Sequence, residues 1–213
     1  MQLSPSRFNA LLKPPGGLGQ KVEWRRAHLC PCRDPVSGQA RPGCLVCRGR
    51  GTFWGAAIRC HTGLAGQKAV REWAAFGLWE SGDVVLTIPS DSALWRAGEL
   101  DRVRLQDSSE TFTTVLSAGT LDQVRTGGIL EIERAFYLDG QQAIVELAIP
   151  AWDADGNLTW SAGGPPAGTR YTISGRRHPE YFIFKDLVQD RAHHGGLALP
   201  RRVVARRFDL FGR

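Results

Sequence analysis

From Gly82 onward, short runs of alternating apolar and polar residues are separated by turn residues. The clearest run covers residues 129–138, where Leu130, Ile132, Phe136 and Leu138 alternate with more polar side chains. A period of two predicts strands with one buried face. Eight strands are predicted, over residues 83–88, 102–106, 111–116, 129–138, 143–149, 169–174, 180–185 and 202–210. Their number and spacing predict a mainly β fold, either an antiparallel β-barrel or a β-sandwich.

Residues 65–77 have a different period. Their apolar side chains recur at helical spacing, at Ala69, Val70, Trp73, Ala74 and Phe76. This spacing predicts one short amphipathic helix, and Gly77 is suited to end it as a C-cap. We expect Trp73 and Phe76 to pack in a core rather than to serve a site.

The first twenty residues contain several Pro and Gly residues around an apolar stretch at residues 8–12. Because Pro and Gly interrupt regular structure, the segment is predicted to be an extended arm with at most one helical turn. Such an arm is expected to become ordered against a neighbouring chain, or to remain an untethered terminus.

Four of the five cysteines lie within residues 30–47, as a CxC pair and a CxxC pair separated by a loop that contains Pro and Gly. Two close pairs of thiolates suit a tetrahedral zinc ion, because each pair supplies two ligands about 2.3 Å from one metal. Such a zinc is structural, since four protein thiolates leave no open position for water. Disulfides and unligated thiols are the alternatives. The predicted ligands are Cys30, Cys32, Cys44 and Cys47.

Two further features adjoin this set. Cys60 and His61 could replace a ligand, although a buried cysteine beside a surface histidine is the simpler interpretation. Gly49 and Gly51 follow the second pair and let the backbone turn its amides toward the thiolates. The resulting CxxCxGxG resembles the repeat of the DnaJ-type zinc domain, but a single repeat and a first pair of the form CxC do not indicate a chaperone.

The spacing of these patterns predicts four parts. They are an extended arm at residues 1–20, a zinc-ribbon-like module with four cysteines at residues 21–62, a connecting helix at residues 63–81, and a β-barrel or sandwich domain at residues 82–213 that ends in a basic strand. With 213 residues, the chain is long enough to bury a sizeable core.

The distribution of charge adds information on possible partners, because the sign of the net charge alternates along the chain. The net charge of +6 divides into +8 for residues 1–60, −8 for residues 61–169 and +6 for residues 170–213. Such blocks are typical of a DNA-facing surface, of ends that dock on acidic partners, or of solvated faces with no specific partner. No apolar run approaches the roughly 18 residues that span a membrane, and no signal peptide is evident, so we expect synthesis in the cytoplasm and no membrane contact.

No motif indicates an enzyme: there is no nucleophile elbow, Walker loop, Rossmann fingerprint or HExxH. The best polar cluster is Asp190, Arg191, His193 and His194, with His178 upstream, and a surface connector or interface contact is its expected role. Residues 153–157 resemble the start of a calcium loop but lack its twelfth ligand, so a plain turn is expected. We therefore predict a protein without catalytic activity.

The C-terminal strand interleaves arginines with apolar residues. Arginine pairs can contact phosphate or carboxylate bidentately, and an edge strand can add to the sheet of a neighbouring subunit. The predicted candidates for an interface or a DNA channel are Arg201, Arg202, Arg206, Arg207, Phe208 and Phe211.

Three stretches occur in a set order: CPCRD…GCLVCRGRG, WESGDVVLTIPSDSALWRAGELDRV, and the ending GRRHPEYFIFKDLVQDRAHHGGLALPRRVVARRFDLFGR. Together they resemble structural proteins encoded among the head and neck genes of tailed bacteriophages and prophages. The resemblance implies a virion component, assembled as a homo-oligomeric ring at the head-to-tail joint, like the β-barrel stopper or collar proteins below the portal. The simple stopper barrel is shorter and has no cysteine module, which would here be an elaboration.

The resemblance also implies partners: portal or adaptor proteins on one side, tail terminator or tail tube proteins on the other, and non-specific contact with genomic DNA. As a hypothesis, the acidic strands of one subunit meet the basic tail of the next, while the basic N-terminal module faces the portal or the DNA. A tail or baseplate protein of the same particle and a zinc-ribbon nucleic-acid-binding protein remain the alternatives.

Overall fold

The computed structural model describes residues 4–14, 16–65, 74–75, 77, 80–119, 122–124, 127–161, 163–187, 193–194 and 197–211. It confirms a mainly β fold with a closed antiparallel barrel, and each of the eight predicted strands is present within a few residues of its expected bounds. The helix predicted over residues 65–77 lies largely outside the described residues. No helix in the described part of the chain is long and apolar enough to cross a membrane.

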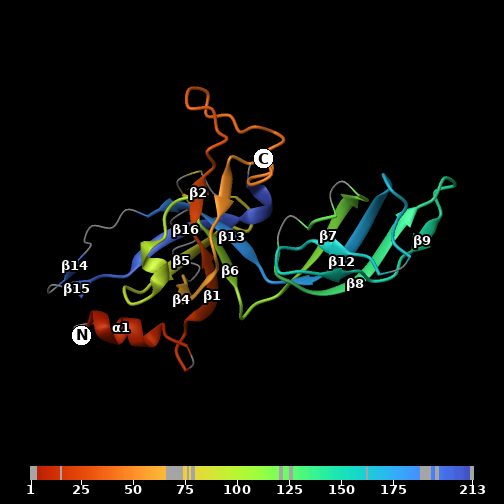
Figure 1. Ribbon diagram of the computed structural model, residues 1–213. Coiled ribbons are helices and arrows are strands. Elements are labelled where there is room, and N and C mark those ends of the chain that lie inside the picture. The colour runs from red at the N-terminus through yellow and green to blue at the C-terminus, as the bar shows by residue number, and fades with distance from the viewer. Residues whose placement is uncertain are drawn as a thin grey trace. The chain divides into compact units, whose positions relative to one another are not determined.

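The chain forms two compact units, which we describe separately. The barrel unit comprises Met1–Leu105 and Glu180–Arg213, and the inserted unit comprises Gln106–Pro179 (Figure 1). The barrel unit contains α1 (Pro5–Leu11), β1 (Gln20–Arg25), β2 (Ala27–Leu29), β3 (Thr52–Trp54), β4 (Ile58–Leu64), β5 (Val84–Ile88), η1 (Ala93–Arg96), β6 (Arg102–Leu105), β13 (Glu180–Asp186), β14 (His193–His194), β15 (Leu197–Ala198), β16 (Arg201–Arg207) and η2 (Phe208–Leu210).

Six strands of the barrel unit close on themselves in the order β1-β4-β5-β16-β13-β6. Closure comes from pairing between β1 and β6, with Val22 opposite Leu105 and Trp24 opposite Val103. The interior is filled by aliphatic side chains, including Leu86, Ile88 and Ile183, none of which is exposed to solvent. The alternation of apolar residues therefore sends one face of each strand into a single core.

These pairings differ from the predicted division of the chain. The barrel does not begin at residue 82, because β1 and β4 come from the segment expected to be a separate cysteine module. It also excludes residues 106–179, which form the inserted unit between β6 and β13. The predicted boundaries followed local composition, whereas barrel closure pairs strands that lie about eighty residues apart in the chain.

The N-terminal arm also differs from its prediction. Residues Pro5–Leu11 are helical rather than extended, and Pro5 starts the helix at a position that needs no backbone donor. The segment is ordered against its own chain: Asn9 donates from Nδ2 to Ser90 Oγ at 2.9 Å, and Leu12 is 7% exposed. Leu12 packs on Gly63 of β4, where an added Cβ would lie 2.8 Å from the leucine Cδ2.

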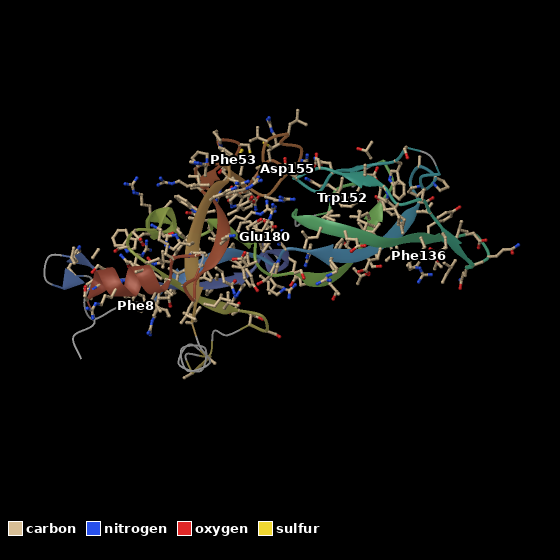
Figure 2. The ribbon with its side chains drawn as sticks, turned by 90° about the horizontal axis from the view of Figure 1, so that it is seen from below. Phe8, Phe53, Phe136, Trp152, Asp155 and Glu180 are labelled. Carbon is tan, nitrogen blue, oxygen red and sulfur yellow. The ribbon has the colours of Figure 1, made fainter. Side chains whose placement is uncertain are left out.

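A buried ion network ties barrel strands together. Glu180 on β13 has a side chain that is only 1% exposed, and both Arg102 and Arg104 on β6 donate to its carboxylate (Figure 2). Arg104 also reaches Glu23 on β1, 3.3 Å away. Buried charges are tolerated when they are paired and hydrogen-bonded, so each of these groups depends on the others.

The inserted unit is built on a sheet in the order β7-β12-β8-β9, with β7 at Glu110–Ser117, β8 at Ile129–Leu138, β9 at Ile144–Glu146 and β12 at Arg170–Arg177. One face of the sheet packs in its own core, which includes Phe112, Ile132 and Ile173. β10 (Ala151–Trp152) and β11 (Leu158–Thr159) form a hairpin. The Asp153 carboxylate accepts from the backbone amides of Asp155 and Asn157, so residues 153–157 form a turn, as expected.

Candidate metal centre

The cysteines lie on a long loop that closes one end of a short hairpin. β2 pairs with β3, with Ala27 opposite Trp54 and Leu29 opposite Thr52, and Cys30 then donates its backbone N–H to Gly51 O at 2.9 Å. The hairpin thus brings the two ends of residues 30–51 together. Figure 1 shows this loop, in orange, extending beyond β2.

The first part of the loop is ordered by a tight turn. The Asp34 carboxylate accepts from the backbone amides of Val36 and Ser37 at 3.0 and 2.7 Å. These bonds lower the pKa of Asp34 below its usual value. Arg33 bridges to Ala40 and donates to Gly38 O at 2.9 Å, so the chain between the two cysteine pairs folds back on itself.

The second cysteine pair lies on a tight turn at residues 44–51, which we call the knuckle, and this turn depends on glycine. Arg48 donates its backbone N–H to Cys44 O at 2.8 Å, and the chain then passes through positive φ at Arg48, Gly49 and Gly51. Glycine adopts these angles without the steric cost of a Cβ. An added Cβ at Gly49 would lie 3.2 Å from Pro42 O, so the turn also needs a small residue there.

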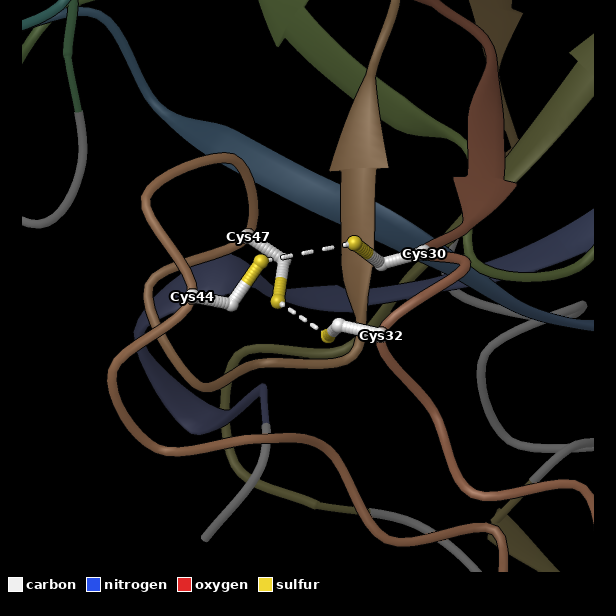
Figure 3. A group of neighbouring side chains, drawn as sticks. All are labelled: Cys30, Cys32, Cys44 and Cys47. Atoms are coloured by element: carbon white, nitrogen blue, oxygen red, sulfur yellow. Dashed lines mark hydrogen bonds between the residues drawn. The ribbon is translucent and has the colours of Figure 1, made fainter.

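This architecture brings all four sulfurs into one cluster. The Sγ atoms lie within 4.8 Å of one another, with 3.7 Å between Cys30 and Cys44 and 3.4 Å between Cys32 and Cys47. A tetrahedral metal with metal–sulfur bonds of about 2.3 Å needs sulfur–sulfur distances of about 3.8 Å. The observed spacing is thus that of a metal-binding set, and Figure 3 shows the four side chains converging from two segments of the loop.

The thiols differ in how readily they ionise. The backbone amides of Cys47 and Val46 donate to Cys44 and lower its pKa to about 6. Desolvation raises the pKa of Cys32 to about 12. A metal ion needs deprotonated sulfur, so Cys44 is ready to bind at neutral pH while Cys32 has to release a proton to bind the metal.

A metal held by all four cysteines would have a structural role. Four thiolates would complete its tetrahedral coordination sphere and leave no position for a substrate or a reactive water. Cys30 and Cys47 are buried, at 4% and 3% exposed, although the loop around them contains few other buried apolar residues. The structure therefore confirms that the predicted cysteines form a possible metal site.

Cys60 and His61 lie elsewhere, on β4 of the barrel. Cys60 packs against the barrel core, and burial raises its pKa to about 11. His61 places Nε2 3.5 Å from an oxygen of Asp91. Neither residue belongs to the cluster of four cysteines. The expected surface position of the histidine is wrong, because the His61 side chain is only 15% exposed.

The structure contradicts the prediction that the C-terminal strand is a free edge. β16 pairs with β5 on one side and β13 on the other, so its backbone cannot add to the sheet of another subunit. Phe208 is completely buried and Phe211 stacks on it, with ring centroids 5.7 Å apart. Phe208 was predicted to be an interface residue, but the apolar spacing that suggested docking serves the chain's own core.

Most of the C-terminal arginines also have partners within the chain. Arg206 donates two bonds of 3.0 Å to the buried carboxylate of Asp83, and Arg201 donates to Asp186 at 2.7 and 2.6 Å. Arg207 lies 3.4 Å from Asp209. Arg202 is exposed. The carboxylate partners of these arginines were not predicted; they lie 123 residues away for Arg206, 15 for Arg201 and 2 for Arg207.

The polar cluster around the histidines is not assembled by the described residues. Asp190 and Arg191 lie outside them, and His193 pairs through its backbone with Ala198 in the β14–β15 hairpin. His178 belongs to the inserted unit, where its Nδ1 lies 2.9 Å from Ser108 O.

The buried network of Glu180 and its two arginines was not predicted, because a single acidic residue at the start of a strand carries no signal of burial.

Comparison of the sequence with protein-family models gives no match, and comparison with curated proteins gives none.

Proposed function

We propose that this chain is a virion structural protein of a tailed bacteriophage, which forms a ring at the head-to-tail joint and connects portal-side and tail-side proteins around the DNA channel. Its role in this proposal is mechanical rather than catalytic. The observation that carries the proposal is the closed six-stranded barrel with two additions, the cysteine loop within one hairpin and the inserted unit between β6 and β13. A closed barrel has no free sheet edge of its own, and the additions supply surfaces for neighbours.

The ordered motifs that resemble phage neck proteins also support this proposal. Their second stretch supplies β5, η1 and the first two residues of β6, and their third supplies β13 and β16. Three of the six barrel strands and the start of a fourth thus lie in the two longer stretches. The resemblance is therefore carried by the barrel itself, which is the part that the stopper and collar proteins have in common.

We further propose that the cysteine cluster holds zinc. A set of four thiolates at tetrahedral spacing favours zinc over the harder cations, which prefer oxygen ligands. Zinc would stabilise the loop that joins β2 to β3 and so fix the position of its turns. Metal analysis of the purified chain tests this: about one equivalent of zinc is expected, and less than half an equivalent with freely titrating thiols contradicts it.

The test of the main proposal is the particle itself. Particles of the phage or induced prophage that encodes this chain should contain it by mass spectrometry, and cryo-EM should show its barrel in a ring between portal and tail. Density for the chain in the tail or baseplate would instead identify it as a tail or baseplate protein of the same particle. Its absence from purified particles would overturn the proposal.

Charge favours a second candidate, a nucleic-acid-binding protein. The barrel unit has 22 Lys and Arg against 12 Asp and Glu, a net charge of +10. Such an excess suits contact with phosphates without base recognition. Gel shifts distinguish the candidates: a dedicated binding protein retains DNA as a monomer at roughly 100 mM salt, whereas a neck protein binds mainly portal or tail rings.

A further inference from the structure

The cysteine loop exposes large apolar side chains to an unusual degree. Val36 and Leu45 are each 94% exposed, and Leu29 and Val46 are each 64% exposed. All four lie between residues 29 and 46. Single exposed apolar residues are common, but several on one small segment are typical of a surface that contacts a partner.

The knuckle explains why two of these side chains point outward. Cys44 and Cys47 turn their sulfurs into the cluster, as Figure 3 shows, and leave Leu45 and Val46 exposed between them. We call Leu45 and Val46 the knuckle tip. Metal binding would hold the tip in one conformation, which reduces the entropy lost when it docks.

The inserted unit offers a matching surface on its β8–β9 hairpin. Leu138 and Ile144 are directly opposite each other on the two strands, and they are 54% and 55% exposed. Residues 129–146 contain four acidic residues, Glu131, Glu133, Asp139 and Glu146, but a single basic one, Arg134. The hairpin, where Figure 2 labels Phe136, thus combines an exposed apolar pair with an excess of negative charge.

The two units carry opposite charges overall. The barrel unit has a net charge of +10, whereas the inserted unit has 5 basic residues against 9 acidic ones, a net charge of −4. Four thiolates around a divalent metal lower the first value only to about +8. The loop itself contributes four arginines against one acidic residue, and Arg41 is exposed beside the knuckle. Opposite charges favour contact between unlike units of two copies.

We propose that the knuckle tip of one copy docks on the β8–β9 hairpin of a second copy of this chain. The contact places Leu45 and Val46 against Leu138 and Ile144, with basic residues of the loop facing the acidic residues of the hairpin. It rests on the proposed function in that both require self-assembly. Because it joins unlike surfaces, it is heterologous and can repeat around a ring. It replaces the predicted contact of the acidic strands with the C-terminal strand, most of whose arginines pair within the chain.

The test uses the full-length, metal-loaded chain and two variants. One carries Leu45→Asp and Val46→Asp, and the other carries Leu138→Asp and Ile144→Asp. Each is expected to weaken self-association at least about tenfold by light scattering and native mass spectrometry, because it places charge in an apolar contact. The matched controls are Leu18→Asp, at 76% exposed, and Val115→Asp on β7, at 62% exposed, and both are expected to assemble normally.

Mixing the two double variants makes the test specific. Each retains one intact surface, so the mixture is expected to form a one-to-one dimer and nothing larger. Unchanged metal content and circular dichroism of each variant show that it has folded. A wild-type chain that stays monomeric at about 100 μM, variants that assemble like wild type, or a mixture that stays monomeric would each overturn the proposed contact.

Failure of this contact and failure of the proposed function are distinguishable. A chain found in particles, but with assembly unaffected by both double variants, keeps its place in the virion and loses this interface. A chain that assembles through this interface but is absent from particles keeps the contact and loses the proposed function.

Discussion

The barrel buries Leu86, Ile88 and Ile183 completely, whereas the cysteine loop leaves Val36 and Leu45 almost fully exposed. Each buried aliphatic side chain contributes about 1.5–3 kcal/mol to folding, and the barrel has many of them. The loop has no comparable core, and its sulfurs converge instead. Two parts of one unit thus differ: apolar burial stabilises the barrel, whereas a metal bound to the four cysteines would stabilise the loop.

The barrel and the cysteine loop should therefore respond differently when each is damaged. Damage to the barrel core is expected to lower the stability of the whole unit, because its strands share one core. Damage to the metal set is expected to loosen residues 30–51 alone, since few apolar contacts tie them to the barrel.

The largest effect is expected from removal of a ligand. Cys44→Ser should lower metal affinity at least about 100-fold, because even residues that only support a ligand contribute 10–100-fold. Hydrogen exchange should then increase across residues 30–51 and remain unchanged in the barrel strands. Cys60→Ser is the control and should retain the metal. Loss of protection throughout the barrel would contradict the contrast.

Acid is expected to weaken metal binding by the loop before it unfolds the barrel. Metal binding requires thiolates, so affinity falls roughly tenfold per pH unit for each thiol that regains its proton. The lowered pKa of Cys44, about 6, favours its thiolate at neutral pH and ceases to do so as the pH falls through 6. Metal affinity, measured with a chromogenic chelator, should therefore fall more steeply below about pH 6 than above it, while the circular dichroism of the barrel persists. Simultaneous loss of both signals would count against separate stabilisation.

Within the barrel, the buried ion network should matter more than a surface pair. Glu180→Ala leaves Arg102 and Arg104 without their shared partner and should cost about 3–5 kcal/mol in denaturant unfolding. Asp186→Ala on the same strand is the matched control: its side chain is 56% exposed in its pair with Arg201, so about 0.2–1 kcal/mol is expected. Equal losses of unfolding free energy in the two variants would show that burial does not decide how much an ion pair contributes to stability.

A comparable test of the apolar core uses two cross-strand partners, Leu86 and Leu64. Leu86 is fully buried, so Leu86→Ala should cost about 2–5 kcal/mol through lost burial and a cavity. Leu64 is 42% exposed, and Leu64→Ala should cost less than half as much. Both variants should keep one equivalent of metal, which chelator titration can check. Loss of metal from Leu86→Ala would mean that the loop depends on the core.

Much of this fold follows from local pattern. Most of the predicted strands exist because alternation with a period of two reports which side of a strand is buried. In β8 the predicted face is wrong: Ile129, Ile132 and Ala135 are buried, whereas Leu130 and Leu138 are exposed. β1 and β4 were not predicted, since Gln20–Arg25 and Ile58–Leu64 are short, rich in polar residues and close to the cysteines. β1 does alternate, with Val22 and Trp24 buried, but its pairing with β6 joins segments about eighty residues apart, which local pattern does not report.

The cysteine site was predicted because its information is local. Two pairs at close spacing, followed by glycines, indicate a possible ligand set even before the hairpin and turns that bring the four sulfurs together are known. The ion-pair partners of the C-terminal arginines were not predictable from local sequence. Arg206 lies beside Asp83 and Arg201 beside Asp186, because β16 pairs with β5 on one side and with β13 on the other.

Local sequence thus predicted eight of the strands and the four cysteines of the possible metal site, because both depend on residues near one another in the chain. The tertiary structure decided which strands close the barrel, that β16 is an inner strand, and that Phe208 is a core residue. It also decided which apolar side chains remain exposed, at the knuckle tip and on the β8–β9 hairpin. The physical reason is that pairing and burial depend on the whole chain, and an apolar residue reveals its role only when its neighbours are in place.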